Sequence, residues 1–173
     1  MITDKKSQSI IISGESGSGK TESTKIILKY LATVSSEIGT SAKAAETDSV
    51  EKQVLDSNPL LEAFGNAKTV KNNNSSRFGK FIQVNFTEFG KIISAKIFNY
   101  LLEKSRIVKI QPEERNYHIF YQFLFGANEQ ERAKYQLKDP TYYKYLKFGC
   151  FKVEDEDDAK NFQETKECMT KLN

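Results

Sequence analysis

A glycine-rich segment at residues 14–21 contains the side chains best suited to chemistry. It reads GESGSGKT and satisfies every fixed position of the phosphate-binding loop pattern G-x-x-x-x-G-K-[ST]. In such a loop the backbone N–H groups point at a phosphate, and the helix that follows directs its positive dipole end at the same anion. The pattern therefore predicts a site for a nucleoside triphosphate.

The polar side chains of this segment have separate expected roles. Lys20 is expected to reach the β- and γ-phosphates, and the Thr21 hydroxyl is expected to ligate Mg²⁺. The glycines allow the backbone to curl around the anion. The residues expected to hold the nucleotide are Gly14, Glu15, Ser16, Gly17, Ser18, Gly19, Lys20 and Thr21.

The flanking residues predict the strand and helix that such a loop requires. Residues 9–13 form a short apolar, β-branched run that is typical of a buried strand. Residues 22–31 read as a helix, with an apolar stripe that continues to Val34. A Gly/Ser-rich turn that merely links a strand to a helix is the alternative, and the two flanking elements favour the phosphate loop.

Composition excludes several classes of partner. The chain has 173 residues, 38% of them hydrophobic, and a net charge of +3 without a run of like charge, so no nucleic-acid partner is expected. No segment provides the roughly 18 apolar residues that a membrane span needs, and the N-terminus does not resemble a signal peptide. A soluble intracellular protein is expected, with Cys150 and Cys168 reduced and His118 in a packing or surface position.

Periodicity and helix breakers predict the remaining elements. Asn58 followed by Pro59 indicates a helix start, and Gly65 and Gly126 are placed to end helices. Alternating apolar and polar residues predict an antiparallel hairpin. The expected elements are helices at residues 50–55, 59–64 and 117–125, a hairpin at 80–102, an exposed flexible loop at 35–48, a polar stretch at 71–76, a short amphipathic piece at 142–146 and a last helix after the acidic residues 154–158.

Five separated blocks identify a family. After GESGSGKT come NPLLEAFGNAK at 58–68, NNNSSRFGKF at 72–81, LLEKSRIV at 101–108 and ERNYHIFYQ at 114–122. In this order they resemble the nucleotide-binding core of the myosin motor domain, and the resemblance covers nearly the whole chain. Kinesins share the Ser-Ser-Arg of the third block but not the Phe-Gly-Lys-Phe that follows here.

The resemblance implies that the nucleotide is ATP and that residues 72–77 are switch I, a loop that closes over the γ-phosphate. Asn72 and Asn74 are expected among the nucleotide-binding residues, and Ser75 near the attacking water. Ser76 would complete the Mg²⁺ shell with Thr21, and Arg77 would pair with a glutamate of switch II. The expected catalytic residues are Lys20, Ser75, Ser76 and Arg77.

The resemblance also implies a fold and partners. The expected fold is α/β, a P-loop NTPase core with an incomplete mixed β-sheet flanked by helices, in a single partial motor domain at residues 1–173 that is truncated at both ends. The hairpin at 80–102 would belong to the transducer, and residues 35–48 to surface loop 1. The intact motor would bind actin filaments in the cytoplasm and cytoskeleton, and light chains are expected only for the full-length protein.

One departure leaves two functions open. Switch II needs an Asp-x-x-Gly-like segment, and no aspartate of this chain has a glycine three residues later, so Arg77 is expected to have no partner. The chain is then either a nucleotide-binding piece of an actin-based ATPase motor, with hydrolysis belonging to the intact protein, or a non-catalytic truncated product that binds nucleotide without motor activity. A small-molecule kinase is disfavoured, because nothing after the phosphate loop resembles an acceptor lid.

Overall fold

The computed structural model describes residues 4–37, 50–154 and 156–172. The chain consists of two compact units, one formed by residues 1–56 and 80–98 and the other by residues 57–79 and 99–173. This division concerns contacts within the chain, and a single partial motor domain over residues 1–173 stays a prediction. Most of the loop expected at residues 35–48 lies outside the described residues.

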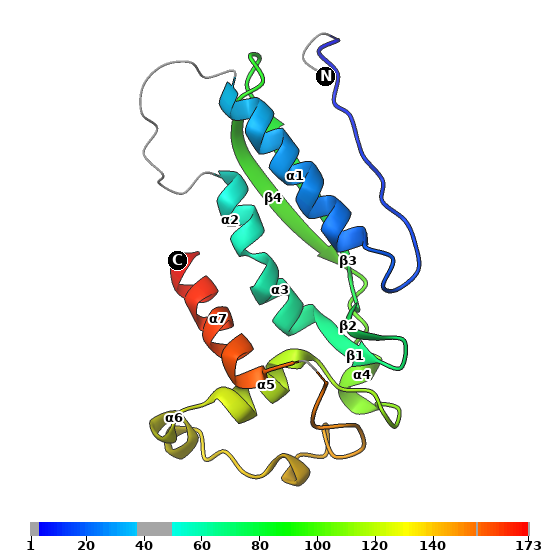
Figure 1. Ribbon diagram of the computed structural model, residues 1–173, viewed down its shortest axis with the longest axis vertical. Coiled ribbons are helices and arrows are strands. Elements are labelled where there is room, and N and C mark those ends of the chain that lie inside the picture. The colour runs from blue at the N-terminus through cyan, green and yellow to red at the C-terminus, as the bar shows by residue number, and fades with distance from the viewer. Residues whose placement is uncertain (1–3, 38–49, 155, 173) are drawn as a thin grey trace. The chain divides into compact units, whose positions relative to one another are not determined.

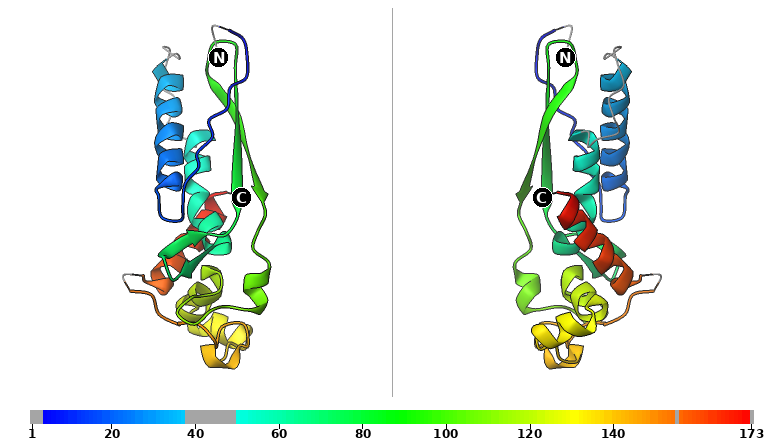
Figure 2. Two further views of the ribbon diagram at one scale, coloured as in Figure 1. Left: turned by 90° about the vertical axis from the view of Figure 1, so that its right-hand side faces the viewer. Right: turned by 90° about the vertical axis from the view of Figure 1, so that its left-hand side faces the viewer.

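The described part of the first unit contains two helices and most of a long hairpin (Figure 1). Helix α1 is Lys20–Glu37, α2 is Val50–Asp56, and the hairpin pairs β3, Gly79–Phe86, with β4, Ile92–Tyr100. Figure 2 shows the two strands twisting around each other, as antiparallel pairs do. The predicted hairpin is confirmed, and α1 is longer than expected because it begins at Lys20 and continues past Val34.

Ser35, expected in a loop, lies in the last turn of α1 and is 5% exposed. Its Oγ accepts a hydrogen bond from the backbone N–H of Ile92 at 2.9 Å. This bond satisfies the first N–H of β4 and joins α1 to the hairpin, so the helix continues where the sequence suggested flexibility.

The prediction of a strand at residues 9–13 is wrong, as far as the described part of the chain shows. These residues are extended but pair with no strand that the structure describes. Ile10 and Ile11 are 66% and 89% exposed. A β-branched run favours extended backbone, but a strand also needs a partner for its N–H and C=O groups.

The second unit is mainly helical. Its core contains Tyr121, Leu124 and Leu146, and the last helix packs against the helices at residues 58–65 and 118–126. Gly126 ends its helix as predicted, whereas Ser57 rather than Asn58 is the N-cap of the first helix. The elements are α3 Asn58–Gly65, β1 Asn66–Thr69, β2 Asn72–Ser76, α4 Ser105–Val108, α5 His118–Gly126, α6 Glu129–Lys134, the 3-10 turn Pro140–Tyr142 and α7 Asp158–Lys171.

The polar cluster expected as a loop is a strand. β2 pairs antiparallel with β1, with Asn66 opposite Ser76 and Ala67 opposite Ser75. The strands that the structure describes thus form two antiparallel pairs, β1 with β2 and β3 with β4, and not a mixed sheet. Asparagine and serine favour strands weakly, so tertiary pairing decides the conformation here.

Candidate functional site

The phosphate-loop residues form a tight bend immediately before α1. Gly17 and Gly19 both have φ +83°, a left-handed conformation that glycine adopts without strain. The bend is closed by a hydrogen bond from the Ser18 N–H to the Glu15 carbonyl at 3.2 Å. Gly14 has φ +156°, and a Cβ there would meet the Ser18 hydroxyl, so this turn also favours glycine where the pattern begins.

Lys20 is the first residue of α1 and folds back over this bend. Its Nζ donates to the carbonyls of Gly14 and Glu15, at 2.6 and 2.7 Å. The bend therefore surrounds a positive charge and is followed directly by the N-terminus of an 18-residue helix. Both features favour an anion at this place. Thr21 lies partly buried in the first turn of the same helix.

The serines of β2 point to opposite sides of the strand. Ser75 is 1% exposed, and its Oγ accepts a hydrogen bond from Arg77 Nη1 at 3.1 Å. Ser76 is exposed, and its Oγ donates to the Phe78 carbonyl at 3.1 Å. A hydroxyl that donates its hydrogen keeps lone pairs for a cation, so the Ser76 contact is compatible with metal binding.

Arg77 has a partner within the chain, so the expectation of a missing partner is wrong. Its Nε donates to Glu103 Oε2 at 2.6 Å. Arg106 Nε donates to the same oxygen at 2.8 Å. Burial raises the pKa of Glu103, but hydrogen bonds and charge from Arg106 and Arg77 outweigh this, and the pKa lies below its ordinary value. Glu103 therefore stays ionised between the two guanidinium groups.

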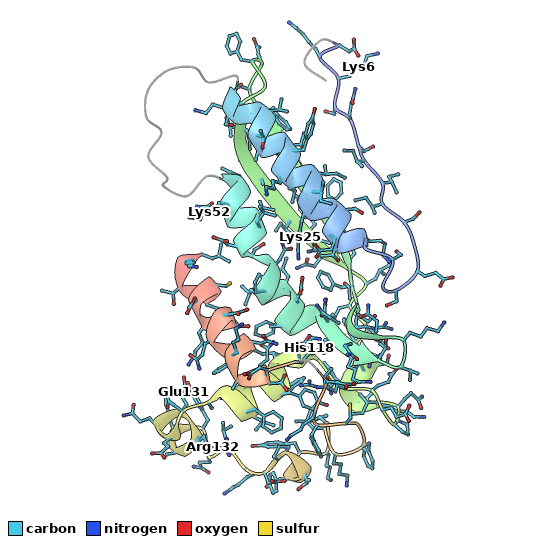
Figure 3. All side chains as sticks on the ribbon, in the orientation of Figure 1. Lys6, Lys25, Lys52, His118, Glu131 and Arg132 are labelled. Atoms are coloured by element: carbon cyan, nitrogen blue, oxygen red, sulfur yellow. The ribbon has the colours of Figure 1, made fainter. Side chains whose placement is uncertain are left out.

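Asn72 and Asn74 use their side chains within the second unit. Asn72 Oδ1 accepts from the Asn74 backbone N–H at 2.9 Å. Asn74 Nδ2 donates to Glu62 at 3.0 Å, while its Oδ1 accepts from Asn66 Nδ2 at 2.8 Å and lies 3.2 Å from His118 Nε2 (Figure 3 labels His118). The Asn74 side chain thus links β2 to α3 and α5 through side-chain contacts.

His118 is buried, which settles the choice between packing and surface in favour of packing. It is 8% exposed and begins α5. Burial lowers its pKa from 6.5 to about 4, and the charge of Arg115 acts in the same direction. The imidazole is therefore neutral near pH 7.

The structure brings the predicted site residues together in two groups. Gly14 to Thr21 form one group in the first unit, and Asn72, Asn74, Ser75, Ser76 and Arg77 form the other in the second unit. Sequence reasoning missed the side chains that hold the second group, which are Glu62, Glu103 and His118. All three lie in the blocks that carry the family resemblance, and that was the available signal.

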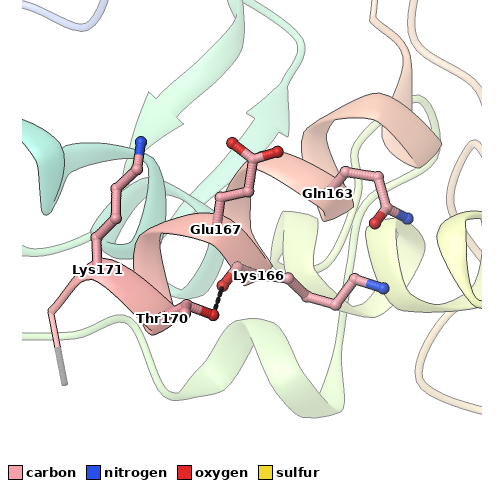
Figure 4. Close-up of a pocket in the computed structure, with 5 residues that line it drawn as sticks. All are labelled: Gln163, Lys166, Glu167, Thr170 and Lys171. Atoms are coloured by element: carbon pink, nitrogen blue, oxygen red, sulfur yellow. Dashed lines mark hydrogen bonds between the residues drawn. The ribbon is translucent and has the colours of Figure 1, made fainter.

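A hollow on α7 and the potential metal ligands among the described residues add no further site residues. A shallow hollow on α7 is lined by residues of that helix alone, so side chains do not converge on it from a second element as they do in ligand sites (Figure 4). Within the described ranges, no group of three or more His, Cys, Asp or Glu could hold a metal ion, and no helix is long and apolar enough to cross a membrane. The lining residues of the hollow are Gln163, Lys166, Glu167, Thr170 and Lys171.

Comparison with known proteins gives one consistent result. A family model described as myosin head (motor domain) matches residues 1–173. The chain is 51% identical over 173 residues to the Myosin-I heavy chain of Dictyostelium discoideum, covering 99% of this chain and 7% of that protein. It is 50% identical over 170 residues to Myosin-8 of Arabidopsis thaliana, covering 98% of this chain and 11% of that protein. It is also similar to the Myosin IB heavy chain of Dictyostelium discoideum, at 48% identity over 170 residues, 98% of this chain and 15% of that protein.

Proposed function

This chain belongs to the myosin head (motor domain) family, and on that premise we propose that it binds Mg·ATP through residues 14–21 and 72–77. One observation carries the proposal. The bend at residues 14–19 encloses the Lys20 ammonium and leads directly into an 18-residue helix. Phosphates are held by such a bend, because its N–H groups, the lysine and the helix dipole all favour negative charge.

The donor set of the chain fits the complex of ATP with Mg²⁺. Lys20, whose Nζ donates to two carbonyls here, would donate to phosphate oxygens instead, which are stronger acceptors for an ammonium group. Thr21 and Ser76 would supply hydroxyl oxygens, and Mg²⁺ is a hard cation that takes oxygen ligands. The metal ion supplies neutralisation of the phosphate charge when it is bound. Backbone N–H groups of the bend would supply the remaining donors, apart from that of Ser18, which is bonded to the Glu15 carbonyl. A P-loop NTPase core would be the fold that holds them.

We assign residues 72–77 to the same nucleotide on the basis of the family resemblance. The exposed position of Ser76 supports a role for this residue in direct contact with the ligand. The side chains of Ser75 and Asn74 are hydrogen-bonded to Arg77 and Glu62 of the second unit. We therefore assign Ser75 and Asn74 the role of stabilising the conformation of the segment. Asn72 and the backbone of the segment would then contact the phosphates. Arg77 would contribute indirectly, by holding the Ser75 hydroxyl in place.

The activity of a complete motor is a broader proposal. The chain spans 7 to 15% of the length of the curated relatives it matches. We propose that in an intact protein the bound ATP is hydrolysed and that hydrolysis is coupled to movement along actin filaments in the cytoskeleton. Light-chain binding would belong to the same intact protein. Nucleotide binding is the part of this activity that we assign to the residues of this chain.

Calorimetric titration of the chain with Mg·ATP tests the proposal. Lys20→Ala should abolish measurable binding, because it removes the charge that the bend encloses. Lys29→Ala is the matched control, since Lys29 is an exposed lysine of the same helix. This variant should bind Mg·ATP as tightly as the unchanged chain does. Circular dichroism would verify that both variants are folded. Equal binding by the two variants, or no binding by the unchanged chain, would overturn the proposal.

A further inference from the structure

We propose that Glu103 is a positioning residue for the nucleotide-binding segment, acting through Arg77 on Ser75. The inference rests on the proposed function of residues 72–77. Glu103 lies outside that segment, 26 residues after Arg77 along the chain. It occupies the connection between β4 and α4.

The contacts from Glu103 to Ser75 are continuous. Glu103 Oε2 accepts from Arg77 Nε at 2.6 Å, and the Glu103 backbone N–H donates to the Arg77 carbonyl at 3.0 Å. Arg77 Nη1 then donates to Ser75 Oγ at 3.1 Å. Because a guanidinium group is planar and rigid, fixing its Nε on a carboxylate also fixes the direction of its other N–H groups. Glu103 therefore sets the position of the Arg77 Nη1 group that donates to Ser75.

Glu103 is itself fixed from the opposite side. Arg106 is 5% exposed and donates from Nε to Glu103 Oε2 at 2.8 Å. Its Nη1 donates to Glu114 Oε2 at 3.1 Å and to the Arg115 carbonyl at 2.9 Å. The Tyr117 hydroxyl donates to the Glu103 carbonyl at 2.7 Å. The positive charges of two arginines are thus matched by the negative charges of two glutamates in one network. Glu103 is the glutamate that contacts both Arg77 and Arg106.

Replacing the Glu103 carboxylate by an amide would leave Arg77 and Arg106 adjacent without the negative charge between them. Arg77 is 28% exposed at its side chain and can rotate away from Ser75 once this charge is lost. We expect Glu103→Gln to weaken Mg·ATP binding by at least about tenfold, the usual size of a lost hydrogen bond to a charged group. Glu103→Asp should restore part of the affinity, because it restores the charge.

Glu114→Gln is the matched control. Glu114 belongs to the same network but contacts Arg106 rather than Arg77. Two measurements are made on the full chain, the NMR resonance of the Arg77 Nε–H without nucleotide and the affinity for Mg·ATP. The Nε–H resonance reports the contact with Glu103 directly, and a loss of stability shared by both variants would not move it selectively.

The proposal predicts a strongly shifted, slowly exchanging Arg77 Nε–H resonance in the unchanged chain and in Glu114→Gln, and its loss in Glu103→Gln. If the unchanged chain lacks this resonance, or if Glu103→Gln binds Mg·ATP as tightly as Glu114→Gln does, the proposal is overturned. Should the resonance behave as expected while the unchanged chain binds no Mg·ATP, the function proposed for the segment fails instead, and the role of Glu103 in binding fails with it.

Discussion

His118 Nε2 lies 3.2 Å from Asn74 Oδ1, although 44 residues separate the two along the chain. Asn74 Nδ2 donates to the Glu62 carboxylate, so the amide oxygen is the atom that faces His118. An amide oxygen only accepts hydrogen bonds, and we infer that the neutral imidazole carries its proton on Nε2. This contact fixes β2 from the side of α5, and the same strand carries the residues assigned to ATP.

The low pKa of His118 makes stability depend on pH in a defined window. The folded pKa is about 4 against 6.5 in the unfolded chain, so the unfolded state takes up the proton first as pH falls. Stability should be fully present above pH 6.5 and decline toward pH 4, by up to about 3 kcal/mol. His118→Gln should remove this part of the decline. The check is the urea unfolding free energy of both chains between pH 7 and pH 4, and parallel profiles would contradict it.

Gly126 should tolerate no side chain. A Cβ at this position would lie 2.6 Å from the Cβ of Phe162 and 2.9 Å from its Cδ1, where α5 meets α7. Gly126→Ala should destabilise the chain by about 1–3 kcal/mol through overpacking. At Gly79 a Cβ would meet Tyr100 atoms at an ordinary 3.7 Å, so Gly79→Ala is the control. Equal urea midpoints for the two variants would show that α7 does not pack on α5 in this way.

Two adjacent aspartates at the start of α7 should differ in their importance. Asp158 pairs with Arg115, which is 1% exposed and lies over the Tyr121 ring at 3.8 Å. Asp157 instead caps the helix, accepting from the N–H groups of Ala159 and Lys160. Asp158→Ala leaves a buried guanidinium without its carboxylate and should cost about 3–5 kcal/mol.

Asp157→Ala, which removes only the cap, should cost about 1 kcal/mol. Thermal unfolding of the two variants measures both effects in one series. A larger loss in Asp157→Ala than in Asp158→Ala would mean that the ion pair with Arg115 does not support the second unit.

Local patterns predicted the parts of the fold that depend on local physics. Ile82 and Val84 alternate with polar residues, and that alternation sufficed to predict the hairpin of β3 and β4. Helix α5 ends at Gly126 as expected, and glycine disfavours helical backbone. The bend at residues 14–19 was predicted from spacing alone, since it depends on glycines that lie close together in the sequence.

The features that local patterns did not predict depend on contacts between residues far apart in the sequence. Residues 72–76 have weak strand propensity, and their strand depends on pairing with β1 and on Asn74 contacts as distant as His118. No spacing rule connects Arg77 with Glu103, so the family resemblance suggested only a glutamate of switch II as a partner and the contact with Glu103 was not predicted. Conversely, residues 9–13 have the strand composition but no partner within the described part of the chain.

The most direct measurement is amide NMR of the chain during titration with Mg²⁺ and a non-hydrolysable ATP analogue. Binding at one shared site predicts that the amides of residues 14–21 and 72–77 shift together, with the same saturation curve. Lys20→Ala should abolish both sets of shifts. Shifts confined to residues 14–21, or curves with different midpoints for the two segments, would contradict the proposal that both hold the same nucleotide.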